Sequence, residues 1–483
     1  MAGQRLVNKI RATSEVLILA AIDLVALLLI FRLSVLVRTN ALPLIYPNFP
    51  VDPPFKNIAN LFWVLLVWLF FFYYENLYTR RFSLWDEIEA LIKASFLSTA
   101  ATFVIISVGK LSDEISRTLV VVMGAITILL VPPLRILSKG LLRKLGFFKR
   151  RVLILGASDS GMRVARALRR ETNYGYTVIG FLDDDPEKIG TRIDGVKVHK
   201  GIDNVLAYAT RSNVKDLFIA LPNRDRDRVR NLVDNLQHKF DQLLFVPDMS
   251  GVFATETTLV HFFHDQVFAL KIRNNLSRPF NILVKRCFDI LASSLLMIML
   301  LIPLLILAAL IKLDLGGPVF FRQTRVGRNG KPFGCRKFRT MYADAEERLS
   351  ALLATDAEAR KEWSTYRKLR NDPRVTTFGE FLRSTSLDEL PQLFNVLLGE
   401  MSLVGPRPVL QEEIDLYYKD KAEFCFSVRP GVTGLWQVSG RNNNGYDYRI
   451  AADLWYVKNW NLWLDIVILL KTVPALLGRV GAY

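Results

Sequence analysis

Two adjacent carboxylates, Asp388 and Glu389, stand just ahead of a short helix that the sequence predicts over residues 391–399. The helix has a proline just inside its start and a glycine just past its end, which is the usual asymmetry of helix termini. Arg383 precedes the pair and Arg407 follows the helix. Acidic groups between guanidinium groups indicate a site for a phosphate and a metal ion. The same run also fits a capping box, in which Glu389 only stabilises the start of the helix.

Histidine is missing from the part of the chain that carries this pair. All four histidines, at positions 199, 238, 261 and 264, precede residue 280. Carboxylates, lysines or hydroxyls must therefore do the chemistry beyond that position, and an ionised aspartate such as Asp388 is the expected nucleophile toward phosphorus. A diphosphate would be repelled by two carboxylates unless a cation intervened. Mg²⁺, which is bound by one or two carboxylates plus substrate phosphates, is the predicted cofactor.

Four arginines beside glycine or proline turns are candidates for binding phosphate oxygens, because the guanidinium fork binds such oxygens in pairs. They are Arg339, Arg383, Arg407 and Arg429. Each one taken alone is also explained as a solvated surface charge. Their grouping around Asp388 and Glu389 favours a phosphate site.

Composition points to a membrane protein with an acidic partner. The chain has 483 residues, a net charge of +17 and 51% hydrophobic residues, and its mean hydropathy is +0.23. The basic residues are spread among apolar segments and no nucleic-acid motif occurs, so a membrane surface explains the charge better than nucleic acid does. The three cysteines are far apart and form neither a disulfide framework nor a metal knuckle, which fits a reducing compartment.

Residues 1–150 predict four membrane helices, near 15–37, 58–74, 91–108 and 119–137. Each is long enough for the hydrocarbon core of a bilayer. Lysines and arginines are concentrated before the first helix, after the second and after the fourth. The positive-inside rule therefore places both ends of the bundle in the cytoplasm.

Residues 151–272 predict a Rossmann-like α/β domain, because short apolar strands alternate with helical segments. The dinucleotide fingerprint is degraded, since Ser158 stands between Gly156 and Gly161 where the motif has its middle glycine. Asp183 is placed where an acid that binds a ribose is expected. A bound nucleotide and a regulatory or architectural domain both remain open.

A further apolar segment lies within residues 280–312. No charged residue occurs from Ile290 to Ile311, yet both flanks are rich in lysine and arginine. Pro303 removes a backbone donor inside the run and is expected to bend the helix. A re-entrant helix that enters and leaves the same face of the membrane reconciles these facts. An ordinary span, with the C-terminal domain on the other side, is the alternative.

Residues 313–483 predict a mostly α-helical, membrane-embedded catalytic domain that is basic apart from an acidic helical stretch at 344–362. Near its end, the tryptophan-rich segment 453–471 is explained either as a helix lying in the membrane interface or as a core helix.

Four motifs in this domain resemble those of a known family. They are Lys337-Phe-Arg339-Thr-Met, Arg383-x-x-Ser-Leu-Asp388-Glu389-Leu-Pro-Gln, Gly405-Pro-Arg407-Pro and Pro430-Gly-Val-Thr-Gly. They are similar to motifs of the bacterial polyprenyl-phosphate hexose-1-phosphate transferases, which are monotopic-type phosphoglycosyl transferases. The resemblance extends over all the predicted domains. The run from Gly434 to Asn442 and the terminal Tyr483 are closer to the galactose 1-phosphate members than to the glucose members.

The resemblance implies that Asp388 attacks the β-phosphate of a UDP-hexose and expels UMP, and that undecaprenyl phosphate then takes the sugar phosphate from the aspartate. Glu389 would hold Mg²⁺. The other implied site residues, which bind phosphate or support the site, are Lys337, Arg339, Arg383, Arg407 and Asp465, with Arg429 as a further phosphate ligand. The re-entrant helix would deliver the lipid phosphate. Many members break that helix with Ser-Pro, whereas this chain has Ile302-Pro303.

The sequence thus predicts a multi-pass enzyme of the bacterial inner membrane, with its active site facing the cytoplasm. It would start an O-antigen, capsule or exopolysaccharide from UDP-galactose, with UDP-glucose as the alternative donor. Whether the chain forms a homo-oligomer stays open. A membrane-anchored, NAD-dependent nucleotide-sugar dehydratase is a rival, since Tyr417-x-x-x-Lys421 matches a Tyr-x-x-x-Lys pair. A non-enzymatic scaffold for polysaccharide assembly is another rival, but it leaves the Asp-Glu pair unexplained.

Overall fold

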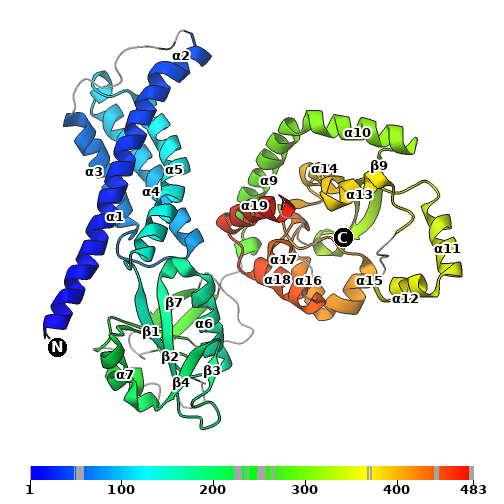
Figure 1. Cartoon of the computed structure of the whole chain (residues 1–483). Helices are drawn as coiled ribbons and strands as arrows, with labels where there is room; N and C mark the ends of the chain where they lie inside the picture. Colours follow the sequence, from blue (N-terminus) through cyan, green and yellow to red (C-terminus); the bar gives the residue numbers. More distant parts are fainter. Residues whose placement is uncertain are drawn as a thin grey trace. The chain divides into compact units, whose positions relative to one another are not determined.

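The computed structural model describes residues 2–47, 49, 59–221, 231–233, 235–236, 239–246, 257–262, 267–272, 275–366, 369, 372–439 and 445–477. The chain divides into two compact units, Met1–Ser250 and Gly251–Tyr483. The first consists of a helical bundle and an α/β sheet, and the second is mostly helical (Figure 1).

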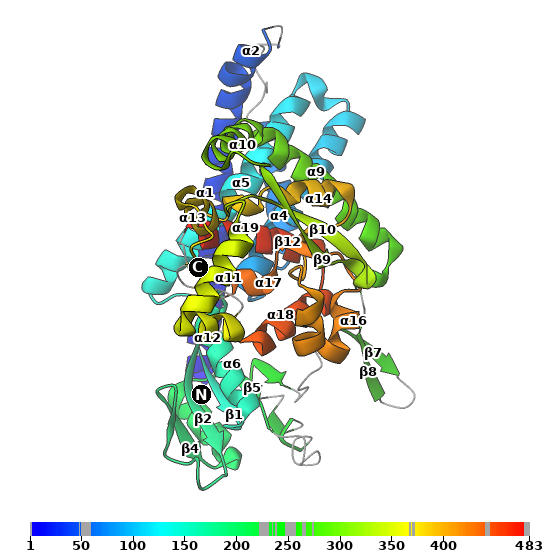
Figure 2. The same cartoon turned by 90° about the vertical axis from the view of Figure 1, so that its right-hand side faces the viewer.

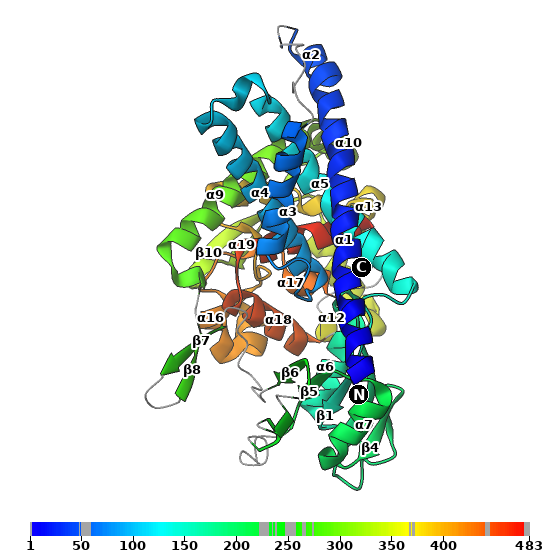
Figure 3. The ribbon, with the colours of Figure 1, turned by 90° about the vertical axis from the view of Figure 1, so that its left-hand side faces the viewer.

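Four apolar helices form the bundle of the first unit, as predicted. They are α1 (Ala2–Leu36), α3 (Ala59–Tyr74), α4 (Leu84–Val108) and α5 (Arg117–Lys144), and α1 continues through a π-helical turn (Val37–Ala41) into α2 (Leu42–Ile45). Figure 3 shows these helices running side by side. Three segments of the described chain are long and apolar enough to cross a membrane, at Thr13–Ile45, Leu84–Val108 and Arg117–Lys144, while α3 contributes a shorter apolar stretch, Phe62–Tyr74. α1, α4 and α5 begin before their predicted starts, and α5 also ends later, because hydropathy marks the apolar part of a helix and not its polar turns; α3 matches its predicted range to within one residue.

A buried group of charges ties this bundle together. Arg135 of α5 donates to Asp23 of α1, to Glu87 of α4 at 3.1 Å and to the Leu77 carbonyl at 2.6 Å. Lys139, one turn further along α5, also pairs with Glu87. Because every charge in this group faces an opposite one, the apolar surroundings can hold it.

The sheet of the first unit has the strand order β3-β4-β2-β1-β5-β6. The strands are β1 (Arg150–Leu155), β2 (Tyr176–Asp183), β3 (Arg192–Ile193), β4 (Val196–Lys200), β5 (Asp216–Ile219) and β6 (Gln242–Phe245), with α6 (Asp159–Arg170), α7 (Val205–Ser212) and short 3₁₀ turns at Thr172–Tyr174 and Ile202–Asn204 between them. All neighbouring strands are parallel except β3 and β4. The expected strands β1, β2, β5 and β6 are confirmed, because buried runs of branched residues mark central parallel strands.

The turn after β1 is closed by the chain's own side chains. Asp183, predicted as a ribose ligand, accepts hydrogen bonds from Ala157 N at 2.6 Å and Asp185 N at 2.9 Å. Ser158 donates to the Ala220 carbonyl at 2.8 Å and caps α6 through Gly161 N. Both side chains therefore have a structural role in this turn.

The second unit begins with an antiparallel pair, β7 (Thr257–Phe262) and β8 (Val267–Ile272), followed by a 3₁₀ turn at Asn275–Ser277 and then α9 (Pro279–Met299) and α10 (Leu301–Leu315). The two apolar helices are bent by 64° relative to each other, as Figure 2 shows around α10. The bend falls at Leu300, three residues before Pro303. Proline has no N–H to bond the Met299 carbonyl four residues back, and its ring clashes with that carbonyl, so α9 ends there.

The part of this unit from β9 onward is built from short elements. They are β9 (Phe320–Val326), β10 (Pro332–Phe338), α11 (Ala345–Thr355), α12 (Ala357–Tyr366), α13 (Thr377–Ser384), η7 (Leu387–Glu389), α14 (Gln392–Leu398), β11 (Ser402–Val404), α15 (Gln411–Glu413), η8 (Ile414–Tyr418), η9 (Lys419–Lys421), α16 (Ala422–Cys425), β12 (Gly431–Thr433), α17 (Leu435–Val438), α18 (Tyr446–Lys458) and α19 (Leu462–Leu477), with a 3₁₀ turn at Arg328–Gly330. β9 pairs antiparallel with β10 and β11 parallel with β12.

The tryptophan-rich segment forms α18 and α19 and lies in the core of this unit. Tyr456, Val457, Trp460 and Ile468 are buried in one hydrophobic cluster with residues of α14 and β11. Their burial fits the core interpretation of the segment and not the interfacial one.

Candidate active site

The helix α9 is anchored to the later part of its unit, from β9 onward, by polar side chains one turn apart. Lys285, Asp289 and Ser293 are the buried polar residues of α9, and residues four apart lie on one face of a helix. Lys285 Nζ donates to the Val404 carbonyl at 3.1 Å. Asp289 Oδ1 accepts from Ser402 Oγ at 3.0 Å and from Leu403 N at 3.1 Å. One face of an apolar helix thus holds β11, the strand that follows α14.

Arg286, also on α9, binds the end of α14. Its guanidinium donates to the carbonyls of Val396 at 2.6 Å and Leu397 at 2.8 Å. Arg429 adds a hydrogen bond from Nε to the Gly399 carbonyl at 2.7 Å. Carbonyls at a helix C-terminus lack partners within the helix, so these two cations satisfy them and fix α14 in place. Arg429, which was predicted to bind phosphate, therefore uses its Nε to bind the end of α14.

The predicted pair Asp388 and Glu389 sits in the single 3₁₀ turn η7, directly before α14. Ser386 precedes it with a left-handed φ of 58° and makes no side-chain cap hydrogen bond, so the capping box does not form. Leu387 and Leu390, which flank the pair, pack on an apolar cluster formed by Ile311 of α10, Phe338 of β10 and Leu382 of α13. Both carboxylates are therefore held on a short turn that packs on an apolar cluster.

Lys337 of β10 reaches both carboxylates. Its Nζ lies 2.6 Å from Glu389 Oε1 and 3.7 Å from Asp388 Oδ2. Burial raises the pKa of Asp388, the Lys337 and Arg383 charges lower it, and Glu389 raises it. Since burial disfavours the charged carboxylate, the two cations are what keep Asp388 available as an anion.

Arg383 is positioned by the start of α13. Its Nε donates to Thr340 Oγ1 at 2.9 Å, and the Thr340 carbonyl accepts from Thr376 N at 3.1 Å. A Cβ on Gly379 would lie 2.1 Å from that carbonyl oxygen, so only glycine lets α13 approach so closely. This contact explains how Arg383 comes to act on Asp388.

The structure also locates the predicted residues Arg339, Arg407 and Pro303. Arg339, two residues beyond Lys337, donates to the Met341 carbonyl at 3.2 Å. Arg407 lies over the ring of Trp436, with Cζ 5.7 Å from the centroid. Pro303 is in the first turn of α10.

Asp465 does not face the reaction centre. It is fully buried in α19, where it accepts from Lys285 Nζ at 2.7 Å, Tyr456 Oη at 2.8 Å and Trp460 Nε1 at 3.0 Å. Those donors occupy both carboxylate oxygens. Of the two roles expected for it, phosphate ligand and support of the site, the geometry fits the second.

Few carboxylates in the described part of the chain are grouped so that they could bind a metal ion. Within the described residues, no group of three or more His, Cys, Asp or Glu side chains is arranged to hold one. Asp388 and Glu389 alone fit Mg²⁺, because this ion takes one or two carboxylates and completes its shell with substrate phosphates and water.

The sequence analysis did not identify every residue that shapes the site. Lys285 and Arg286 were interpreted only as positive flanks of an apolar segment, although they hold β11 and α14. The four-residue spacing of Lys285, Asp289 and Ser293 was the available signal. Arg325 and Arg449 were also missed, because nothing in their local sequence distinguishes them from surface arginines.

Comparison with known proteins identifies relatives over most of the chain. Residues 280–479 match the family described as bacterial sugar transferase, and residues 72–247 match a CoA-binding domain family. The chain is 39% identical to an uncharacterized sugar transferase of Haemophilus influenzae, over 84% of this chain and 85% of that one. It is 38% identical to the undecaprenyl-phosphate galactose phosphotransferase of Salmonella typhimurium, over 84% of each. A UDP-glucose:undecaprenyl-phosphate glucose-1-phosphate transferase of Klebsiella pneumoniae is 33% identical, over 71% of this chain and 70% of that one.

Proposed function

The chain belongs to the bacterial sugar transferase family, and on that premise we propose that it transfers hexose 1-phosphate from a UDP-hexose to undecaprenyl phosphate. The products are undecaprenyl-diphospho-hexose and UMP, and the reaction starts a surface polysaccharide. The observation that supports this best is the pairing of Lys337 with Asp388 and Glu389 on a turn that packs on an apolar cluster, to which α10 contributes Ile311. A phosphoryl-transfer centre next to an apolar cluster suits one soluble and one lipid substrate.

Asp388 is the nucleophile of the first half-reaction. One carboxylate oxygen forms a bond to the β-phosphorus of UDP-hexose, and the bond from that phosphorus to the bridging oxygen breaks, so that UMP leaves. Lys337 and Arg383 act on Asp388. They stabilise its carboxylate before the attack and the charge on the phosphoryl oxygens during it.

The second half-reaction regenerates the carboxylate. A phosphate oxygen of undecaprenyl phosphate attacks the same phosphorus, and the bond to Asp388 breaks. No proton needs to leave a neutral nucleophile in either step, because both nucleophiles are anions. The centre therefore works without a histidine base.

Mg²⁺ is the proposed cofactor, held by Glu389 together with substrate phosphates. When bound, it neutralises charge on the diphosphate. Glu389 Oε1 also lies 2.6 Å from Lys337 Nζ. This ion pair limits how far the carboxylate can move.

We also propose that α9 and α10 form a re-entrant hairpin in the inner membrane. The rest of the second unit, from β9 onward, then lies on the cytoplasmic face. The 64° bend at Leu300 and the basic residues on both flanks support this arrangement. The α/β sheet, with β1 between β2 and β5, has the strand neighbours of a Rossmann-like domain.

Galactose is the proposed hexose, in keeping with the activity in the name of the Salmonella relative. Glucose is the alternative, after the Klebsiella relative. The dehydratase rival loses its support, since Tyr417 stacks on Tyr446 with ring centroids 3.8 Å apart and the relatives are transferases.

The proposal is tested by incubating the purified full chain with undecaprenyl phosphate, Mg²⁺ and a panel of UDP-sugars. UMP release with one UDP-hexose supports it and identifies the sugar. Absence of UMP release with every UDP-sugar, from folded protein in a bilayer, would contradict it.

A further inference from the structure

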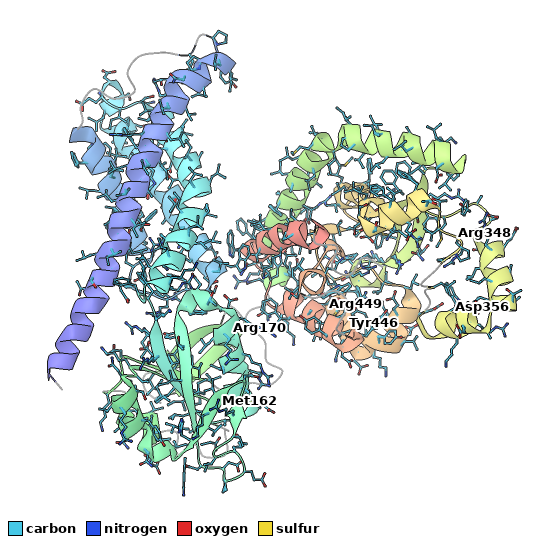
Figure 4. All side chains as sticks on the ribbon, in the orientation of Figure 1. Met162, Arg170, Arg348, Asp356, Tyr446 and Arg449 are labelled. Atoms are coloured by element: carbon cyan, nitrogen blue, oxygen red, sulfur yellow. The ribbon has the colours of Figure 1, made fainter. Side chains whose placement is uncertain are left out.

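A second group of cations lies in the same unit as Asp388, and two of them lie on Trp436. The third, Arg325, is joined to Arg449 through the shared carboxylate of Glu413. We call Arg325, Arg407, Trp436 and Arg449 the Trp436 cluster. Arg449 Cζ lies 5.1 Å from the centroid of the Trp436 ring and Arg407 Cζ lies 5.7 Å from it. Figure 4 shows Arg449 and Tyr446 next to each other near the start of α18. Guanidinium groups repel one another, so two of them on one indole call for a balancing anion.

Several donors of the Trp436 cluster have no hydrogen-bond partner among the residues that the structure describes. Nε and Nη2 of Arg449 and Nε1 of Trp436 are buried and make no hydrogen bond within the described part of the chain. The side chain of Arg449 is only 12% exposed. Buried donors are nearly always satisfied, and a buried charged donor without an acceptor is costly. Three such donors on neighbouring side chains indicate a site for an acceptor that the described residues do not supply.

The acidic groups around the Trp436 cluster are already occupied. Glu413 accepts from Arg325 Nη1 at 3.2 Å, Tyr446 Oη at 2.8 Å and Leu410 N at 3.1 Å, and lies 3.6 Å from Arg449 Nη1. Asp453 accepts from Tyr418 Oη at 2.9 Å. Three guanidinium groups thus face two carboxylates, which leaves positive charge for a ligand.

The β9–β10 hairpin connects the Trp436 cluster to the reaction centre. Directly paired residues of an antiparallel hairpin point to one side, as do residues two apart along a strand. Arg325 pairs with Phe333, and Cys335 and Lys337 follow at two-residue steps. Arg325 and Lys337 therefore share one face, about 13 Å apart at 3.3 Å per residue.

Charges from both sites also meet at Cys335. Burial raises the pKa of the Cys335 thiol, and its further causes are the charges of Lys337, Glu389, Arg325 and Arg407. The Trp436 cluster is therefore a neighbour of the Lys337–Asp388–Glu389 centre.

The position along the hairpin distinguishes the two phosphate substrates. Arg339 lies beyond Lys337 on the side of α10, since its Nη1 would be 2.9 Å from a Cβ on Gly317, just after that helix. The apolar helix α10 is where a lipid tail fits. The Trp436 cluster lies in the opposite direction along the hairpin, toward the polar elements α15 and α18.

We propose that the Trp436 cluster binds the nucleotide phosphate of the donor, the group that leaves as UMP, with Arg449 as its main ligand. The inference rests on the proposed function and assigns one of its two substrates to this part of the site. The free donors of Arg449 bind phosphate oxygens, and the indole N–H of Trp436 supplies a further donor. Arg449 is then a specificity-determining residue for the leaving nucleotide and not for the lipid.

The test compares Arg449→Gln, Arg449→Lys and Arg348→Gln in the full chain. Arg348 (labelled in Figure 4) is a matched control, since it is an arginine of the same unit on α11. It pairs with Asp344 at 2.9 Å. The measurements are UMP binding by calorimetry, the KM for UDP-hexose and the KM for undecaprenyl phosphate. We expect Arg449→Gln to weaken UMP binding and raise the UDP-hexose KM by about tenfold or more, since a hydrogen bond to a charged group is lost. Arg449→Lys should recover part of this, and Arg348→Gln should match the wild type.

The KM for undecaprenyl phosphate should stay within about twofold in all three variants, because the lipid phosphate has a different ligand set. A raised lipid KM with unchanged UMP binding would overturn the assignment, and so would a lowered Tm with unchanged kinetics and binding. UMP binding needs no turnover, so it tests Arg449 even if no UDP-sugar is a substrate. An inactive wild type that still loses UMP binding on Arg449→Gln would contradict the proposed function and support this site.

Discussion

Two groups of carboxylates and cations, one in each unit, differ in how completely they are paired. In the bundle, the side chains of Arg135, Asp23 and Glu87 are at most 3% exposed, and each faces an opposite charge. In the second unit, the side chains of Lys337, Glu389 and Asp388 are 26%, 24% and 11% exposed. Every charge of the first group is paired inside the protein, whereas the second group keeps an exposed face beside a largely buried carboxylate, the proposed nucleophile Asp388. A charge group whose members are all buried and paired thus has a structural role, whereas one that keeps an exposed face can react with a ligand.

The bundle group also joins two parts of the first unit. Asn173, in the 3₁₀ turn before β2, donates to Glu87 Oε2 at 2.7 Å and to the Phe82 carbonyl at 3.3 Å. Arg81 donates to the carbonyls of Tyr174 at 2.6 Å and Phe148 at 3.1 Å. The α/β sheet is therefore fixed to the bundle by directional polar contacts.

The largest expected effect is on the reactive group. Asp388→Asn should lower UMP release by about a thousandfold or more, because the nucleophile is lost while the cations around it remain. Thermal unfolding should show that the variant is folded. Retention of more than a tenth of the activity would mean that Asp388 is not the nucleophile.

In the buried charge group of the bundle, Arg135→Gln should instead reduce the stability of the protein. Removing one partner of a buried ion pair leaves uncompensated charges, at a cost of about 3–5 kcal/mol. The thermal unfolding midpoint in a fixed lipid or detergent should fall, and the kcat of the remaining folded protein should be unchanged. Exposed Lys93, which pairs with Glu75 at 2.8 Å, is the control, since Lys93→Gln should change stability little. An unaltered midpoint for Arg135→Gln would break the distinction between the two groups.

Removing Lys337 should change the pH dependence of the reaction. Lys337 lowers the pKa of Asp388, which burial raises, so Lys337→Gln should raise this pKa further. Because the ionised carboxylate is the reactive form, the acid limb of the kcat/KM profile should move to higher pH, and the rate at low pH should fall more than the rate at high pH. Lys337→Arg keeps the charge and should keep the limb near its wild-type position. A limb that does not move in Lys337→Gln would show that it reports another group.

The smallest expected effect concerns Asp453, beside the Trp436 cluster. Burial raises its pKa to about 7 from an ordinary 3.8. A carboxyl group whose pKa is raised by folding stabilises the protein below its unfolded pKa, and this contribution is lost as the pH rises through the folded pKa. Asp453→Asn should therefore make the Tm vary less between pH 4 and 7, by a few degrees. Parallel Tm profiles for wild type and variant would contradict this assignment.

Much of the fold was open to prediction because it depends on local patterns. Apolar runs marked the bundle helices, and the branched residues of β1 marked a buried strand. The bend between α9 and α10 was expected from Pro303, but it falls three residues earlier, because the steric effect of proline acts on the preceding turn. Strands β3 and β4 were missed, since β3 has two residues and β4 has five with mixed polarity.

The candidate site was predictable only in part. Lys337, Asp388 and Glu389 come together as their motifs indicated. Arg429 and Asp465 carry equally recognisable sequence signals, yet Arg429 Nε binds the end of α14 and Asp465 pairs with Lys285. A motif specifies which residues are present, and the packing of distant elements decides which of them keep free donors or acceptors.

By itself, the sequence determined the apolar helices, the parallel sheet and the candidate pair Asp388 and Glu389, because hydropathy, periodicity and helix termini act over a few neighbouring residues. Only the tertiary structure decided that Lys285 meets Asp465, 180 positions away, and that Arg449 lies on Trp436 with buried donors that find no partner among the described residues. Such contacts depend on burial and on which partners are already taken. Both are properties of the packed chain, so no local pattern encodes them.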